Sequence, residues 1–145
     1  MVTKSELIHV FAEAIGTMEG FYKHNTWAQK NNNPGNIRVW GKNPQVGGFV
    51  RFETVAKGWG ALYTQVDKNL FTRRLTILEF FQGKPGVYGG YAPAADKNNP
   101  THYAEFVRQF VVRKTGLTIA DVNVVLATFT FAPELEMPKG STNRT

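Results

Sequence analysis

Cysteine is absent from this 145-residue chain, and its absence removes several kinds of chemistry at once. A disulfide framework, a thiolate zinc site and a cysteine nucleophile are all excluded. No apolar run approaches the roughly 18 residues of a membrane span, and the N-terminal residues contain no apolar signal-peptide segment. We therefore expect a protein made in the cytoplasm without a signal peptide and not inserted into a membrane.

Serine and histidine are scarce, which removes other common nucleophiles and metal ligands. The two serines, Ser5 and Ser141, do not lie in a nucleophile-elbow sequence. The three histidines, at positions 9, 24 and 102, show neither zincin nor paired spacing. A Walker loop and a dinucleotide fingerprint are also missing. We expect no metal and no cofactor, so carboxylates are the expected catalytic groups if the chain is an enzyme.

Acidic residues are fewer than basic ones, with 11 Asp and Glu against 17 Lys and Arg and a formal net charge of +6. Such a charge favours a polyanionic partner, either nucleic acid or an acidic cell-surface polymer. The basic residues are dispersed along the chain, and no helix-turn-helix or RNP-like motif accompanies them. No nucleic-acid partner is therefore expected, and nucleic-acid binding ranks third among the functions considered.

Apolar periodicity predicts one mainly helical α+β domain over residues 1–132, followed by a polar tail over 133–145. Thr3, Thr76, Asn99 and Thr118 have the sequence contexts of helix N-caps. The predicted elements are a helix from Thr3 to Gly20, a loop over 25–44, a short hairpin over 46–54 that turns at Gly47-Gly48, a helix from about residue 55 to 70, a short helix over 76–81, a loop over 84–99, a helix from Pro100 to Gly116 and a last helix from Thr118 to about 126.

Glu19 is the carboxylate that this pattern singles out. Counting back by fours gives Ile15, Phe11 and Leu7, so its side chain emerges on or beside the apolar stripe of the first helix. Partial burial and the negative end of the helix dipole both predict a raised pKa, as general-acid catalysis on a glycosidic oxygen requires. On position alone, an ordinary solvated glutamate is the more frequent case.

The aromatic residues divide into core and surface candidates. Trp59 shares an apolar face with Leu62 and Val66, which predicts a core position. Trp40 lies between Val39 and Gly41 in a polar loop, and an exposed ring there would suit stacking on the C–H face of a sugar. Trp40 is therefore the predicted sugar-stacking residue.

Three groups of short motifs resemble, in their order, the lysozyme-like peptidoglycan-cleaving domains of phages and prophages. They are Met18-Glu19-Gly20-Phe21 with Asn32-Asn33-Pro34-Gly35-Asn36-Ile37-Arg38, then Gly48-Phe49-Val50-Arg51-Phe52 with Gly58-Trp59-Gly60-Ala61-Leu62, then Tyr91-Ala92-Pro93 with Asn98-Asn99-Pro100-Thr101-His102-Tyr103. The resemblance spans roughly residues 7–112. It implies a lysozyme-like fold, in which a substrate cleft runs between helices and a small β hairpin or sheet.

By that resemblance, Glu19 is the catalytic acid and base of a lytic transglycosylase. It would cleave the β-1,4 bond between N-acetylmuramic acid and N-acetylglucosamine and leave 1,6-anhydromuramic ends. The alternatives are a hydrolytic muramidase, which would add a second acid such as Glu53 or, less favoured, Asp96, and a virion or cell-wall module that binds glycan without cleaving it. The resemblance places Tyr91 and Tyr103 in the cleft. The predicted substrate-binding residues are Asn33, Asn36, Arg38, Trp40, Tyr91, Asn98 and Tyr103.

The expected partner is the glycan strand of peptidoglycan, and the expected state is a monomer. Without a signal peptide, a holin, lysis or a virion would deliver the protein to the cell wall or periplasm.

Overall fold

The computed structural model describes residues 2–134, and the polar tail predicted over 133–145 lies outside the described residues except for its first two positions. The fold is mainly helical with one two-stranded antiparallel sheet, which confirms the predicted class. The elements are α1 (Lys4–Met18), α2 (Trp27–Lys30), β1 (Gln45–Val46), β2 (Phe49–Val50), α3 (Val55–Asp67), the π-helical turn η1 (Lys68–Thr72), α4 (Ile77–Gln82), the 3-10 turn η2 (Ala94–Asp96), α5 (Pro100–Thr115), α6 (Ile119–Val122) and the 3-10 turn η3 (Leu126–Thr128).

The predicted helix starts are confirmed by their caps. The Thr3 side chain accepts a hydrogen bond from the Glu6 amide at 3.0 Å, and Thr76 and Glu79 form a reciprocal capping box at the start of α4. Asn99 caps α5, and Gly116 ends that helix in the left-handed region at φ 78°. These caps satisfy backbone groups that the helices leave unpaired, so local sequence sets where these helices begin.

Four predicted segments differ from the structure. The helix predicted from about residue 55 to 70 is α-helical only to Asp67 and continues as the π-helical turn η1, and the loop predicted over 84–99 contains the 3-10 turn η2. The segment 25–44 contains the one-turn helix α2, which Thr26 caps by accepting from the Gln29 amide at 3.2 Å. The last predicted helix ends at Val122 instead of reaching Leu126, which lies in the separate turn η3. The helices α2 and α6 each have a single turn that begins at a threonine cap, and apolar periodicity does not detect helices this short.

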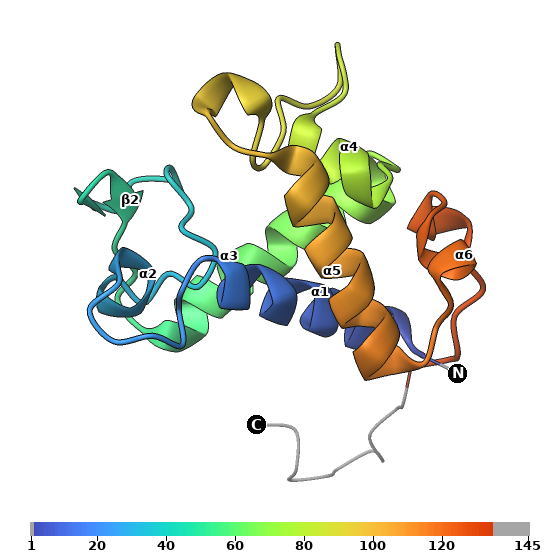
Figure 1. The fold of residues 1–145 in the computed structure, drawn as a ribbon. Coiled ribbons are helices and arrows are strands. Elements are labelled where there is room, and N and C mark those ends of the chain that lie inside the picture. Colours follow the sequence, from blue (N-terminus) through green and yellow to red (C-terminus); the bar gives the residue numbers. More distant parts are fainter. Residues whose placement is uncertain (1, 135–145) are drawn as a thin grey trace, which may run out of the picture.

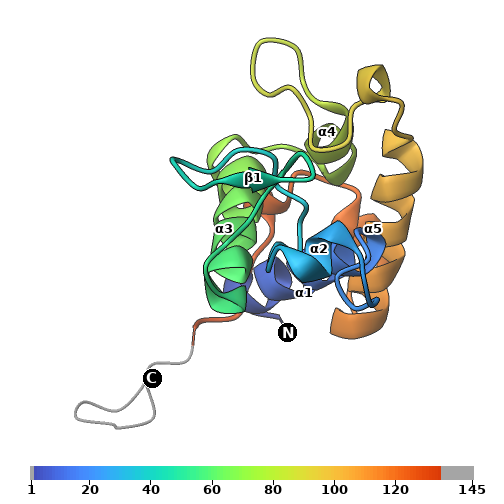
Figure 2. The ribbon, with the colours of Figure 1, turned by 90° about the vertical axis from the view of Figure 1, so that its left-hand side faces the viewer.

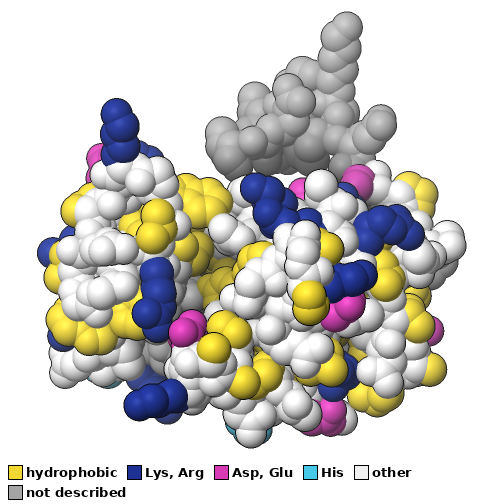
Figure 3. Space-filling model, turned by 90° about the horizontal axis from the view of Figure 1, so that it is seen from above, with side chains coloured by type: hydrophobic (Ala, Val, Ile, Leu, Met, Phe, Trp, Pro, Cys, Tyr) yellow, Lys and Arg dark blue, Asp and Glu magenta, His cyan; other side chains and the backbone are white. Residues whose placement is uncertain are grey.

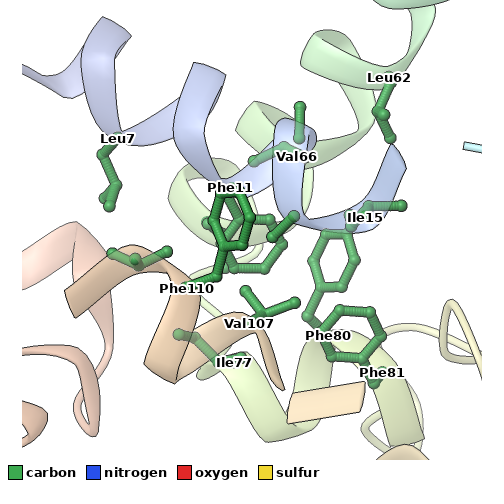
Figure 4. Packing of buried hydrophobic residues seen from close by; sticks show 14 of the residues in the cluster. Leu7, Phe11, Ile15, Leu62, Val66, Ile77, Phe80, Phe81, Val107 and Phe110 are labelled. Carbon is green, nitrogen blue, oxygen red and sulfur yellow. The ribbon is translucent and has the colours of Figure 1, made fainter. Parts of the chain in front are cut away.

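The hydrophobic core lies where α1 crosses between α3 and α5, with α4 closing the far side (Figures 1 and 2). Phe11 is fully buried at its centre, with ring centroids 5.0 Å from Phe80 and 6.1 Å from Phe81 (Figure 4). Trp59 packs against this core from its edge while remaining half-buried, in agreement with the predicted core position. A rigid core of this kind fixes the C-terminal end of α1 relative to α5.

Residues 20–54, between α1 and α3, form a small lobe that contains α2 and the β1–β2 hairpin; we call it the hairpin lobe (Figure 2). The hairpin turns at Gly47 and Gly48, both with positive φ, as predicted. The long connection between α4 and α5 lies at the top of the molecule in Figure 1, across from the hairpin lobe. No helix of the described residues is long and apolar enough to cross a membrane.

Candidate active site

Glu19 is the residue that ends the first helix. Its amide donates to the Ile15 carbonyl at 2.9 Å, and Gly20 then takes φ +80°, which turns the chain away from the helix axis. The Phe21 amide donates back to the Gly16 carbonyl at 3.0 Å and secures this turn. The Glu19 side chain therefore leaves a rigid helix end instead of a mobile loop.

Two hydrogen bonds from distant parts of the chain hold the Glu19 carboxylate. The Tyr103 hydroxyl, on α5, donates to Oε1 at 3.1 Å, and the Asn36 amide nitrogen, in the hairpin lobe, donates to Oε2 at 3.1 Å. Burial raises the pKa of Glu19 above its usual range, while these two hydrogen bonds and the charge of Arg38 partly oppose the rise. The raised pKa has the direction predicted from the sequence.

Tyrosines 91 and 103 form the wall of the site opposite the hairpin lobe. Tyr91 stacks on Phe80 at 5.3 Å between centroids, and its hydroxyl donates to the Gly35 carbonyl. A Cβ at Gly35 would collide with the Tyr91 hydroxyl, so a larger residue there would displace the Tyr91 side chain. Burial, together with the negative charge of Glu19, raises the pKa of Tyr103 to about 12 and that of Tyr91 well above its usual value. Both phenols therefore remain neutral hydrogen-bond donors.

Most of the predicted site residues lie together around a hollow of about 160 Å³. The residues that line this hollow are Glu19, Gly35, Asn36, Arg38, Phe49, Tyr91, Ala92, Asn98 and Tyr103. A second hollow of about 290 Å³ shares three of them and extends the first into a groove, with Gln65, Tyr88 and Asp96 among its other lining residues. Figure 3 looks down on this face, which is hollowed between the hairpin lobe and the rest of the molecule.

Asn33 holds the hairpin lobe together and does not reach the groove. It is fully buried, its amide nitrogen donates to the carbonyls of Ile37 and Val50 at 2.9 Å each, and its oxygen accepts from the Ile37 amide. Its hydrogen-bonding capacity is used within the fold, which corrects the predicted contact with substrate. Neighbouring Asn31 likewise bonds to the Val46 carbonyl at 2.8 Å.

Trp40 also differs from its prediction. The ring is half-buried and packs against the hydrophobic core, and Trp40 lines neither hollow, so the expected exposed stacking surface is not observed. Phe49 is the aromatic residue of the hairpin lobe that lines the hollow instead, with the Arg38 guanidinium 5.5 Å from its ring centroid. The alternation of the hairpin, with Val50 buried and Phe49 on the other face, was the available signal for this residue.

The two further candidate acids, Glu53 and Asp96, do not line the hollow that contains Glu19. The Glu53 side chain is 77% exposed and forms an ion pair with Lys57 at 2.8 Å, which lowers its pKa. Glu53 lines neither hollow, whereas Asp96 borders the second one. Among residues 2–134 no group of three or more His, Cys, Asp or Glu side chains is arranged to hold a metal ion.

Glu19 is thus the one carboxyl group that lines the smaller hollow, and neutral donors surround it. Comparisons with protein-family models, with curated proteins and with solved structures find no match. The functional conclusion therefore depends on the geometry and chemistry of this site.

Proposed function

We propose that this protein cleaves the β-1,4 bond between N-acetylmuramic acid and N-acetylglucosamine in peptidoglycan, with Glu19 as general acid and base. The observation that carries the proposal is the environment of Glu19. Its carboxyl has a raised pKa, is oriented by Asn36 and Tyr103, and lines a groove. A carboxylic acid that stays protonated near neutral pH can donate a proton to a glycosidic oxygen.

The proposed reaction is that of a lytic transglycosylase. Glu19 transfers its proton to the glycosidic oxygen as the bond from that oxygen to C1 of N-acetylmuramic acid breaks. The C6 hydroxyl of the same sugar then attacks C1, and the Glu19 carboxylate takes its proton. The products are a 1,6-anhydromuramic end and a free hydroxyl on N-acetylglucosamine, and Glu19 is again protonated. No water is consumed.

The absence of a second carboxylate from the smaller hollow favours this route over hydrolysis. Glycosidases that use two carboxylates hold them roughly 5 to 9.5 Å apart across the sugar. Glu53 points into solvent and is paired with Lys57, so in this conformation it does not face Glu19 across the hollow. Hydrolysis by a muramidase is the second candidate, and Asp96, which borders the neighbouring hollow, is the further carboxylate that lines the groove.

Digestion of purified sacculi, followed by mass spectrometry of the released muropeptides, tests the proposal. We expect products that end in 1,6-anhydromuramic acid, and we expect Glu19→Gln to reduce cleavage by at least about a thousandfold, because it removes the acid and the base together. Glu53→Gln is the matched control and should retain wild-type activity.

Three results would overturn parts of the proposal. Full activity of Glu19→Gln would exclude Glu19 as the catalytic group. Reducing ends in place of anhydro ends would show hydrolysis. Tight binding to sacculi without any cleavage by the wild-type chain would favour a glycan-binding module. If the proposal holds, the site of action is the cell wall.

A further inference from the structure

The hairpin lobe carries most of the net positive charge of this protein. Its residues 20–54 contain five Lys and Arg side chains and one Glu, whereas the other described residues contain ten Lys and Arg against nine Asp and Glu. The net +6 of the chain is thus unevenly distributed: one small lobe is strongly basic, while the rest of the described chain is close to neutral.

The charges of the lobe are also left uncompensated by the fold. All five of its cations, Lys23, Lys30, Arg38, Lys42 and Arg51, are exposed, and within residues 2–134 none of them forms an ion pair. The single acid of the lobe, Glu53, is paired with Lys57 of α3. Elsewhere five of the ten described cations form ion pairs, as in Lys4–Asp67 and Lys114–Glu13.

This basic lobe forms one wall of the groove. Arg38 and Phe49 of the lobe line the hollow that contains Glu19, and dark-blue side chains surround the same lobe at the left of Figure 3. The hollow contains Glu19, which becomes a carboxylate when it donates its proton, and in that state it would repel an anionic group bound beside it. A fitting ligand therefore places uncharged units in the hollow and its negative charges outside, along the lobe.

We propose that the hairpin lobe binds the carboxylates of the stem peptides that branch from a peptidoglycan strand lying in the groove. The proposal rests on the proposed function for the identity of the strand. The sugars of peptidoglycan are uncharged, and the carboxylates are carried by the peptides attached to N-acetylmuramic acid. A stem of four residues extends up to about 13 Å, which allows its carboxylates to reach cations around the lobe. Nucleic acid fits less well, because its charges lie along the backbone itself.

The test measures binding to insoluble, phosphate-free sacculi by co-sedimentation, with Glu19→Gln in every protein so that the ligand is not consumed. One batch of sacculi is untreated, and in the other the carboxylates are blocked by carbodiimide coupling to ethanolamine. The lobe variant combines Lys23→Gln, Lys30→Gln and Lys42→Gln, which line neither hollow.

The matched control removes three exposed cations outside the lobe, through Lys68→Gln, Arg74→Gln and Arg113→Gln. We expect the lobe variant to bind untreated sacculi on the order of tenfold more weakly at low salt, as the loss of three exposed charge pairs predicts. Binding to blocked sacculi should be weak and the same for both variants. The control variant should bind untreated sacculi like the parent protein, and high salt should remove the difference.

Equal weakening by the lobe and control variants would show that only net charge matters and would overturn the proposal. If the lobe substitutions weakened binding to blocked sacculi as much as binding to untreated sacculi, the stem-peptide carboxylates would be excluded as the ligand of the lobe. Tighter, lobe-dependent binding to a single-stranded DNA oligonucleotide than to sacculi would assign the lobe to nucleic acid. Cleavage by the wild-type chain is measured separately, so a failure of the proposed function is distinguished from a failure of the docking proposal.

Discussion

The carboxyl group of Glu19 experiences two opposed influences. Burial favours its protonated form, while hydrogen bonds from Asn36 and Tyr103 favour the carboxylate, and burial is the larger effect. Both forms are therefore supported by neighbouring groups, as a residue that donates and then accepts a proton requires. The donors come from residues 17 and 84 positions away in the sequence.

The raised pKa of Glu19 predicts a gain in stability from Glu19→Gln at neutral pH. Between the unfolded and the raised folded pKa, the folded protein binds more protons than the unfolded chain, so the stability of the wild type falls as pH rises through this window. We expect the variant to melt at a higher temperature than the wild type at pH 7, with the difference shrinking toward pH 4. Thermal unfolding followed by circular dichroism measures this.

Glu53→Gln is a control for this prediction, because the pKa of Glu53 is shifted in the opposite direction. Its ion pair with Lys57 lowers the pKa of Glu53, so the pair contributes its small stabilisation above the unfolded pKa and loses it as pH falls. If Glu53→Gln raised the stability at pH 7 as much as Glu19→Gln, the gain could not be assigned to the raised pKa of Glu19.

Tyr103→Phe should move the alkaline limb of the pH–rate profile to higher pH. Removing the hydroxyl takes away a hydrogen bond that stabilises the Glu19 carboxylate, so the pKa of Glu19 rises further. A charged hydrogen bond of about 1.5 kcal/mol corresponds to a shift of roughly one pH unit. The profile of kcat/KM on sacculi measures it. Tyr91→Phe, whose hydroxyl bonds to Gly35 and not to Glu19, should leave this limb nearly in place.

At the level of elements, the site depends on how closely α3 packs on the asparagine-rich loop. Gly58 lies in the first turns of α3, and a Cβ there would collide with the Asn32 carbonyl oxygen and lie 3.0 Å from Pro34 Cδ. The Phe52 amide in turn donates to the Asn31 carbonyl at 2.9 Å. The helix, the loop and the end of the hairpin are thus held in one arrangement, which brings Asn36 to Glu19.

Gly58→Ala should destabilise the protein by about 2–3 kcal/mol, because backbone atoms of the loop must move to admit the methyl group. Gly60→Ala is the matched control in the same helix. Gly60 is exposed with open space around its Cβ position, so alanine there should stabilise α3 by about 0.5–1 kcal/mol. Chemical denaturation measures both. Equal effects of the two substitutions would show that the close approach of α3 to the loop is unimportant.

At the level of the whole molecule, one core supports the helices that carry the site. The rings of Phe11, Phe80 and Phe81 form a triangle, and Phe81 also lies against Tyr103, with ring centroids 5.4 Å apart. Through these rings the core connects α1 and α4 to the tyrosine that binds Glu19. Loss of packing at the centre should therefore disturb stability and catalytic geometry together.

Phe11→Ala should lower the free energy of unfolding by about 3–5 kcal/mol, because it leaves a cavity at the centre of the core. The variant should still unfold in one cooperative transition, since one cluster of buried residues extends through the helices. Urea denaturation followed by both fluorescence and circular dichroism measures this. Val87→Ala, at a residue 45% exposed, should cost under about 0.5 kcal/mol. Two separate transitions for Phe11→Ala would contradict a single core.

Sequence alone determined where the capped helices begin and the position of Glu19 at the end of the first helix. Caps such as Thr3, Thr76 and Asn99 act on amides within three residues, and Gly20 ends α1 next to Glu19. Interactions this local are visible in the order of residues. The same holds for the hairpin, whose turn needs only two adjacent glycines with positive φ.

Only the tertiary structure decided which side chains reach the groove. Asn33 and Asn36 lie in one motif, yet Asn33 is used inside the fold and Asn36 bonds to Glu19. Trp40 turns toward the core, and Glu53 is drawn outward to Lys57. Each outcome depends on partners brought close by packing, because burial and charge act through space and not along the chain.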